Sequence, residues 1–344
     1  MGGHLTVVVG AQFGSEGKGA IAAALTYPDT VTVRVAGPNA GHTAVAKDGT
    51  PWALRQIPAA AVVGHGPVVI AAGSEIDVGV LESEVRMLDA AGHDISQRLV
   101  VDAQATIIEP RHKQTETGLV QAVGSTGKGI GAARADRLMR QASLWGSTGH
   151  PLATHPSTSE VLIYHLANGG HVLVEGTQGY GLGLHAGHYP KCTSSDTRAI
   201  DMLAMAGISP WGTEVDDFEV AVVARTFPIR VAGASGELKG ETTWDDLGLP
   251  TERTTVTQKV RRVGTWDPDL VRSAVTANGR GEHTWVALTM FDHLFPELAG
   301  KTSAALTGEQ RDWLADAESQ IGAPIRMLGT GPSTWINRSE RGKR

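Results

Sequence analysis

Residues 5–19 read Leu-Thr-Val-Val-Val-Gly-Ala-Gln-Phe-Gly-Ser-Glu-Gly-Lys-Gly. The first five residues are mostly apolar and β-branched, which is typical of a strand buried in a sheet. A glycine-rich loop follows from Gly10 to Gly19, and the residues from Gly19 to Leu25 predict a helix. Between a strand and a helix, backbone N–H groups and the positive end of the helix dipole can meet a phosphate. We therefore expect the loop to bind the phosphates of a nucleotide.

Particular residues of the loop suit a triphosphate. Gly14, Gly17 and Gly19 let the backbone approach a ligand closely, and Lys18 supplies a point charge for the terminal phosphates. The loop is not a strict P-loop, because Gln12 stands where that pattern needs glycine and Gly19 where it needs Ser or Thr.

Further strand candidates alternate with helical stretches along the chain, which is the pattern of a parallel sheet covered by helices. Asp77 is expected to cap one helix, and Ser157 with Glu160 forms a capping-box pattern before another. The polar stretch 228–262 predicts binding loops. We expect an α/β fold, a single large domain over residues 1–344 around a mainly parallel, doubly wound sheet with long binding loops. The other strand candidates are residues 30–35, 171–174, 220–223, 285–289 and 325–328.

Composition argues against several classes of function. The chain has 344 residues, 41% of them hydrophobic, with a net charge of −6 and no basic tract, so nucleic-acid binding is not expected. Cys192 is the one cysteine, which excludes an internal disulfide and fits a reducing compartment. No apolar run reaches membrane-spanning length, so no membrane association and a cytoplasmic location are expected, the host cytoplasm if a phage encodes the chain.

The loop at residues 10–19 resembles the N-terminal signature of the adenylosuccinate synthetase family, Gly-x-Gln-aromatic-Gly-x-Glu-Gly-Lys-Gly. That family couples triphosphate hydrolysis to the joining of aspartate to C6 of a purine monophosphate. Further segments similar to family motifs follow in the expected order: 37–43, 124–131, 175–179, 189–195, 259–264, 289–292 and 329–332.

The resemblance implies a role for each segment. His42 would stabilise the transferring γ-phosphoryl group, and Gln178 would donate to the purine 6-oxygen as charge builds there. Mg²⁺ would be the cofactor, bound at Ser15 and Gly41, because it bridges phosphate oxygens. The triphosphate would contact Gly14, Ser15, Glu16, Gly17, Lys18, Gly19, Gly41, His42, Thr43, Arg261, Asp292, Gly329, Gly331 and Pro332.

The other two substrates would use a second set of residues. L-Aspartate would be held by Thr255, Val256, Thr257, Lys259 and Arg261. Arg140 would reach into the site of a partner subunit, which implies a homodimer. The purine monophosphate would contact Ser15, Asn39, Ser125, Thr126, Arg140, Gln178, Thr193 and Lys259.

Position 15 departs from the family. Ser15 stands where the family has a catalytic aspartate that takes the proton of purine N1, and a serine hydroxyl does not act as a carboxylate base. A smaller, neutral residue leaves room for a 2-amino group, because N1 lies beside C2. The acceptor would then be dGMP or GMP, as in the phage-type 2-aminoadenylosuccinate synthetases, and the short chain fits that branch. The acceptor of the N1 proton stays open between a water, the aspartate substrate and a neighbouring group.

Two more departures concern other ligands. Met290 replaces the lysine that packs on the guanine of GTP, which favours ATP or dATP, whereas the retained Asp292 favours GTP. Lys259 replaces an arginine and loses its bidentate fork. Two alternatives remain, an adenylosuccinate synthetase that uses IMP and a non-catalytic nucleotide-binding protein. The intact His42 and Arg261 disfavour the second.

Overall fold

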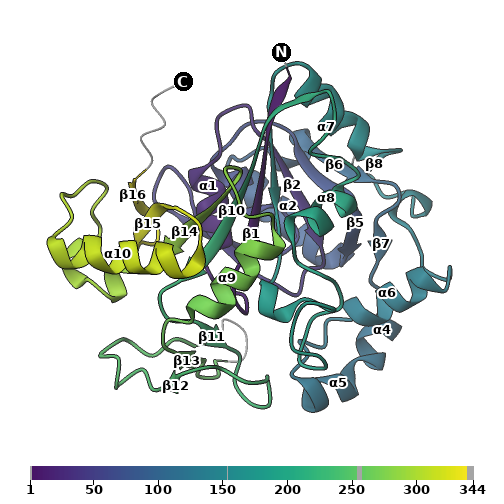
Figure 1. The fold of residues 1–344 in the computed structure, drawn as a ribbon. Helices are drawn as coiled ribbons and strands as arrows, with labels where there is room; N and C mark the ends of the chain where they lie inside the picture. Colours follow the sequence, from purple (N-terminus) through teal and green to yellow (C-terminus); the bar gives the residue numbers. More distant parts are fainter. Residues whose placement is uncertain (1, 153, 254–257, 339–344) are drawn as a thin grey trace.

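A central sheet of 11 strands organises the computed structural model, which describes residues 2–152, 154–253 and 258–338 (Figure 1). The predicted strands all form, some with extended ends. In spatial order the sheet contains β16 (Thr334–Asn337), β15 (Ile325–Gly331), β14 (Thr284–Thr289), β10 (Val215–Arg225), β1 (Gly3–Gly10), β9 (His171–Glu175), β2 (Val31–Ala36), β5 (Val68–Ile76), β6 (Leu99–Asp102) and β8 (Thr154–His155), and β7 (Thr106–Ile107) pairs with β5.

The sheet is mainly parallel, as predicted. β1 lies between β9 and β10, and both pairings are parallel. The strands from β8 to β15 pair in parallel, and β16 is antiparallel to β15 at one edge. The carboxyl ends of the parallel strands therefore lie along one edge, where open α/β sheets bind ligands.

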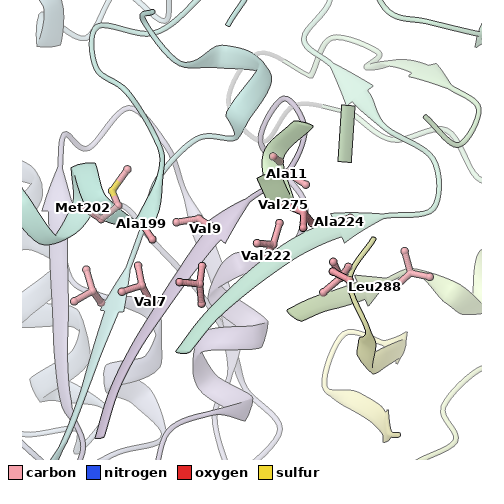
Figure 2. Packing of buried hydrophobic residues seen from close by; sticks show 14 of the residues in the cluster. Val7, Val9, Ala11, Ala199, Met202, Val222, Ala224, Val275 and Leu288 are labelled. Atoms are coloured by element: carbon pink, nitrogen blue, oxygen red, sulfur yellow. The ribbon is translucent and has the colours of Figure 1, made fainter. Parts of the chain in front are cut away.

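Helices cover both faces of the sheet because successive side chains of a strand point to opposite sides. Val7 and Val9 of β1 belong to the larger core, which Figure 2 shows with Met202 and Val275. Val8 faces the other way, into a core formed with α1. The helices that pack in the larger core are α7 (Thr158–Ala167), α8 (Ala199–Ala206), α9 (Pro268–Ala277) and α10 (Gly308–Ile321). Elsewhere α1 (Lys18–Ala24) packs with η1 (Ala59–Val62), and α2 (Val78–Ala90) packs with α3 (Ile95–Arg98).

The remaining elements lie outside the main sheet. α4 (Pro110–Thr115), α5 (Thr117–Val123) and α6 (Ile130–Leu138) gather beyond β7 (Figure 1). The predicted loops of 228–262 contain a small sheet of β11 (Ile229–Arg230), β12 (Glu241–Thr242) and β13 (Arg262–Gly264). The others are β3 (His42–Val45), β4 (Pro51–Leu54), η2 (Trp145–Ser147), η3 (Tyr180–Leu182), η4 (Phe291–His293) and η5 (Pro296–Leu298).

The helix caps show which local predictions succeed. The Asp77 side chain accepts from Val80 N at 3.4 Å, so the predicted cap forms. The capping box at Ser157 does not form, because the Ser157 hydroxyl pairs with the Ser159 hydroxyl at 2.8 Å, although the helix begins at the next residue as expected. No described helix is long and apolar enough to span a membrane.

Candidate active site

The predicted phosphate loop, residues 10–19, follows β1 at the carboxyl edge of the sheet, and Glu16 organises it from inside. The Glu16 carboxylate is fully buried and accepts from Gln12 N at 3.0 Å and from Gly14 N at 2.8 Å. It also accepts from Lys18 Nζ at 2.6 Å. Glu16 therefore holds the loop in shape and sets the position of Lys18, rather than facing a phosphate itself.

The structure explains why two positions of the loop are glycine. Gly17 has a φ of 90° at the start of α1, a left-handed conformation that glycine adopts without strain. At Gly19 a Cβ would lie 2.9 Å from the Cβ of His42 and 2.9 Å from the Thr43 carbonyl oxygen. The missing side chain at Gly19 lets α1 approach β3, so the phosphate loop and the histidine segment lie together.

His42 begins β3 and is buried against an ion pair. Its Nδ1 lies 2.6 Å from Glu175 Oε1 and 2.7 Å from Arg34 Nη1, and Arg34 Nη1 lies 2.8 Å from the same Glu175 oxygen. Arg34 of β2 and Glu175 of β9 are direct neighbours in the sheet register, and both are fully buried. The sheet register therefore fixes the Arg34–Glu175 ion pair that contacts His42.

Burial and charge shift the pKa values of this cluster. Burial, followed by the Arg34 charge, lowers the pKa of His42 to about 4. For Glu175 burial acts in the opposite direction, but the hydrogen bond and charge of His42 and the charge of Arg34 outweigh it and lower its pKa to about 2. At neutral pH the cluster is a neutral imidazole beside an ionised carboxylate and a guanidinium.

A second buried arginine lies beside Ser15. Arg225 ends β10, and its Nη1 donates to the Ser15 carbonyl at 3.4 Å and to Glu252 Oε2 at 3.2 Å. Its Nη2 donates to Glu252 Oε1 at 2.5 Å. Arg261 Nη1 lies 4.0 Å from Glu252 Oε2, so Glu252 lies between the two arginines. Burial raises the pKa of Glu252 but the Arg225 hydrogen bond and charge outweigh it, and the pKa is lowered overall.

The segments predicted to bind the triphosphate converge on the loop. The Thr289 hydroxyl donates to the Glu16 carbonyl at 2.7 Å, which ties β14 to the loop. Gly329 of β15 packs against the Thr289 backbone, where a Cβ would lie 3.0 Å from its Cα. Asp292 follows in η4 and is partly exposed. Gly331 ends β15 and Pro332 is exposed in the turn that follows it.

The predicted purine segments lie on the other side of the loop. Gln178 follows β9, and its carbonyl packs against Gly10, where a Cβ would come within 2.6 Å of it. Thr193 is tied to residue 182 by a backbone hydrogen bond of 2.7 Å. Ser125 is partly buried and Thr126 is exposed before α6, and Asn39 is partly exposed after β2. Gly37 packs against Ile130 at the start of α6, because a Cβ on Gly37 would lie 2.3 Å from the Ile130 side chain.

The start of α6 is closed by Glu116 of the preceding helices. The Glu116 carboxylate accepts from Gly129 N at 2.7 Å, Gly131 N at 2.5 Å and Ala132 N at 3.2 Å. These backbone groups are therefore already satisfied by the chain. Gly127 N also donates to the Ser125 hydroxyl at 3.2 Å, and Thr126 between them is exposed.

Some predicted residues are placed away from the cluster or outside it. Arg140 is exposed after α6 with a φ of 61°, beside Leu138 and Met139, which are 72% and 66% exposed. Lys259 is exposed. The predicted aspartate residues Thr255, Val256 and Thr257 lie outside the described residues.

The backbone is left-handed at several non-glycine residues of these loops. Ser15 has a φ of 58°, Gln178 of 62° and Met290 of 58°. Such conformations cost free energy for residues with a Cβ and gather at functional sites. The loops after β1, β9 and β14 therefore each have a strained residue at the carboxyl edge.

Sequence reasoning missed three charged residues of the site, Arg34, Arg225 and Glu252, and gave no role to a fourth, Glu175, although it begins the motif segment 175–179. Arg34, Glu175, Arg225 and Glu252 are all drawn into it by the fold. One signal was available, because charged residues at the ends of otherwise apolar strands are rarely buried without a partner. Among the described residues, no group of three or more His, Cys, Asp or Glu side chains could hold a metal ion.

Comparison with known proteins identifies the family. The adenylosuccinate synthetase family model matches residues 7–151 and 150–299. The adenylosuccinate synthetase of Methanococcus aeolicus is 36% identical over 337 residues, 95% of this chain and 96% of that protein. That of Pyrococcus horikoshii is 36% identical over 335 residues, 95% of each chain.

Solved structures share the fold. The cyanophage S-2L succinoaminodeoxyadenylate synthetase, bound to dGMP and to dATP as an energy donor, superposes with a TM-score of 0.80 at 27% identity, over 99% of this chain and 97% of that one. The fully ligated adenylosuccinate synthetase of Plasmodium falciparum gives a TM-score of 0.81 at 20% identity, over 97% and 99%, and shows the fold alone. The chain is an enzyme that forms a carbon–nitrogen bond, and it belongs to the adenylosuccinate synthetase family.

Proposed function

We propose that this enzyme joins L-aspartate to C6 of dGMP or GMP and hydrolyses ATP or dATP. The product would be a 2-amino derivative of adenylosuccinate, on the route to diaminopurine nucleotides. Ser15 carries the proposal. It is exposed on the phosphate loop, where the family has a carboxylate, and its small neutral side chain leaves room for the 2-amino group beside N1.

The cyanophage structure supports this substrate, because that protein binds dGMP and dATP and matches this chain over nearly its full length. The rival is IMP, favoured by the higher identity to archaeal adenylosuccinate synthetases. Chain length does not separate the two, since an alignment of 337 residues already covers 96% of the Methanococcus aeolicus protein. The short chain fits the phage-type branch and the archaeal relatives equally well.

The proposed reaction has two steps. The purine 6-oxygen attacks the γ-phosphoryl group, and the aspartate amine then displaces the phosphate at C6. Lys18, fixed by Glu16, would hold the terminal phosphates, and Gln178 would donate to the 6-oxygen. Arg261, half-buried beside Glu252, would bind the aspartate substrate and the triphosphate.

Mg²⁺ would be held mainly by the triphosphate, with oxygen ligands from Ser15 and Gly41. The described residues offer no carboxylate cluster for a metal, and Mg²⁺ commonly binds through substrate phosphates with few protein ligands. The residues fit such a site. When bound, the ion would neutralise charge on the phosphates.

The donor would be ATP or dATP because Met290 offers an apolar surface to the base without a cation. Asp292 remains beside it and allows GTP as the second candidate. Arg140 would act in a homodimer: it is exposed next to the exposed Leu138 and Met139, and apolar side chains of this kind favour a subunit contact.

One assay tests the substrate. The enzyme is incubated with aspartate, Mg²⁺, one of ATP, dATP or GTP, and one of dGMP, GMP or IMP, and phosphate release and product mass are followed. We expect turnover with dGMP or GMP and the adenine donors. Turnover with IMP but not with a guanylate would refute the proposal.

A further inference from the structure

The stretch of chain that carries Arg261 is paired with the stretch before it. Arg261 N donates to the Glu252 carbonyl at 2.9 Å. Beside this bond, Arg253 and Val260 form an antiparallel bridge. The Arg261 carbonyl accepts from Trp244 Nε1 at 2.8 Å. Both backbone groups of Arg261 are therefore engaged, and its position follows that of Glu252.

The Glu252 side chain connects this paired stretch to the end of β10. Its carboxylate oxygens accept from the two terminal nitrogens of Arg225, at 2.5 Å and 3.2 Å, which is a bidentate geometry. The Arg225 side chain is buried, so without Glu252 its guanidinium would be a buried charge that lacks its carboxylate. The pair is therefore a firm link, unlike an ion pair on the surface.

Arg225 is in turn bound to the phosphate loop. The Gln12 side chain donates to the Arg225 carbonyl at 3.0 Å and accepts from Arg225 N at 3.1 Å. Arg225 Nη1 donates to the Ser15 carbonyl at 3.4 Å. A continuous series of hydrogen bonds and one ion pair therefore runs from the phosphate loop, through Arg225 and Glu252, to the backbone of Arg261.

Glu252 treats its two arginines differently. Its carboxylate forms hydrogen bonds with Arg225, whereas Arg261 Nη1 lies 4.0 Å from Glu252 Oε2, which is beyond hydrogen-bond distance. The contact with Arg261 is therefore one of charge, which attracts the guanidinium without fixing its N–H groups. Arg225 takes the hydrogen bonds of the carboxylate, and Arg261 stays close to it.

We propose that Glu252 is a positioning residue for the aspartate substrate: bound to Arg225, it sets the distance between Arg261 and the phosphate loop. One guanidinium can then reach a carboxylate of aspartate at the place where the triphosphate is held. The inference rests on the proposed function in assigning Arg261 to aspartate, and it holds for either purine monophosphate. Glu252 acts through Arg261 and touches no substrate itself.

The first test measures KM for aspartate and for the purine monophosphate, with whichever monophosphate and triphosphate turn over. Glu252→Gln keeps the size of the side chain but loses its charge and one of its two bonds to Arg225. The aspartate KM should rise by about 10- to 100-fold, because a displacement of about 1 Å at a binding group has effects of this order. The KM for the monophosphate should change little, since most of its predicted contacts lie across the phosphate loop.

The matched control is Glu241→Gln. Glu241 forms a bidentate pair with Arg262, the residue next to Arg261, at 2.6 Å and 2.5 Å, but this pair lies within the small sheet. We expect the aspartate KM of Glu241→Gln to equal that of the wild type. Equal rises in Glu241→Gln and Glu252→Gln would contradict the proposal.

A double-mutant cycle separates positioning from general distortion. If Glu252 acts through Arg261, adding Glu252→Gln to Arg261→Ala should leave kcat/KM for aspartate where Arg261→Ala alone puts it. Two losses that multiply would overturn the proposal. If Arg261→Ala leaves kcat/KM for aspartate unchanged, the proposed role of Arg261 fails and the positioning role fails with it. If Arg261→Ala lowers it and Glu252→Gln does not, the positioning role alone fails.

Arg225→Lys tests the other half of the pair. Lysine keeps the buried charge opposite Glu252 but loses the bidentate fork, so this variant should fold and its aspartate KM should rise less than that of Glu252→Gln. Urea unfolding of each variant shows whether the fold is retained. An aspartate KM that stays at the wild-type value in folded Arg225→Lys and folded Glu252→Gln would refute the proposal.

Discussion

Replacing Ser15 by aspartate tests the origin of substrate choice. Ser15 is exposed and has a φ of 58°, a region that Asp and Asn tolerate better than most residues, so Ser15→Asp and Ser15→Asn should fold like the wild type. If the serine leaves room for the 2-amino group, the larger side chain forces the guanylate from its place. Crowding a fitted site costs about 1–3 kcal/mol. This corresponds to a fall of about 5- to 150-fold in kcat/KM for dGMP relative to IMP.

The assay measures kcat/KM for dGMP and IMP side by side, with the same donor and saturating aspartate. Ser15→Asn adds nearly the same volume without charge, so it separates crowding from electrostatics. A loss in both variants would assign the choice to space, and a loss in Ser15→Asp alone would assign it to charge. An unchanged dGMP to IMP ratio in both variants would refute the reasoning.

Four other perturbations have defined outcomes. Burial lowers the pKa of His171 to about 3, below its ordinary 6.5, so its contribution to stability is complete above pH 6.5 and is lost as pH falls toward 3. The free energy of unfolding of the wild type should therefore fall between pH 7.5 and pH 5.5. In urea unfolding, His171→Gln should make this fall smaller by about 1.4 kcal/mol. Glu16→Gln breaks a buried ion pair and should lower the free energy of unfolding by about 3–5 kcal/mol in the same titrations. An unchanged free energy of unfolding would show that the loop holds its shape without the carboxylate. If Arg140 completes the partner's site, mixing inactive Arg140→Ala with inactive His42→Asn should restore about a quarter of wild-type turnover after subunit exchange, and no restoration would argue against a shared site. Met290→Lys should raise kcat/KM for GTP relative to ATP, and an unaltered donor ratio would show that this side chain does not contact the base.

The fold was largely predictable from the sequence because its core strands are short apolar runs. Residues 5–9, 171–174 and 220–223 each became part of a parallel strand, and they are adjacent in the sheet. β5 was not predicted, although its first residues are apolar, because Gly73, Ser74 and Glu75 interrupt the pattern. The fold explains the interruption at Gly73, where a Cβ would lie 2.3 Å from the Met205 side chain of α8.

The site was predictable where it consists of contiguous motifs, and not where it depends on pairing between distant strands. The loops after β1 and β9 carry their own glycines and polar residues, and the loop after β14 carries Asp292, so the sequence indicates them directly. Arg34 and Glu175 are 141 positions apart, and only the parallel register of β2 with β9 places them side by side. No local sequence pattern connects Arg225 with Glu252 either. Glu252 lies between β12 and β13, in the long excursion of the chain outside the main sheet.

This difference bears on which residues of such a site can change. Residue 15 lies exposed on a loop whose shape depends on the Glu16 carboxylate, so its side chain can vary without disturbing that framework. His42, Arg34 and Glu175 are buried, and two of them are locked in the sheet register, so a change in one leaves a buried charge without its partner. A carboxylate at position 15 can therefore be lost while a neutral, oriented imidazole remains. The exposed loop residue is therefore the place where substrate choice can change, and the buried cluster behind it is the part that stays.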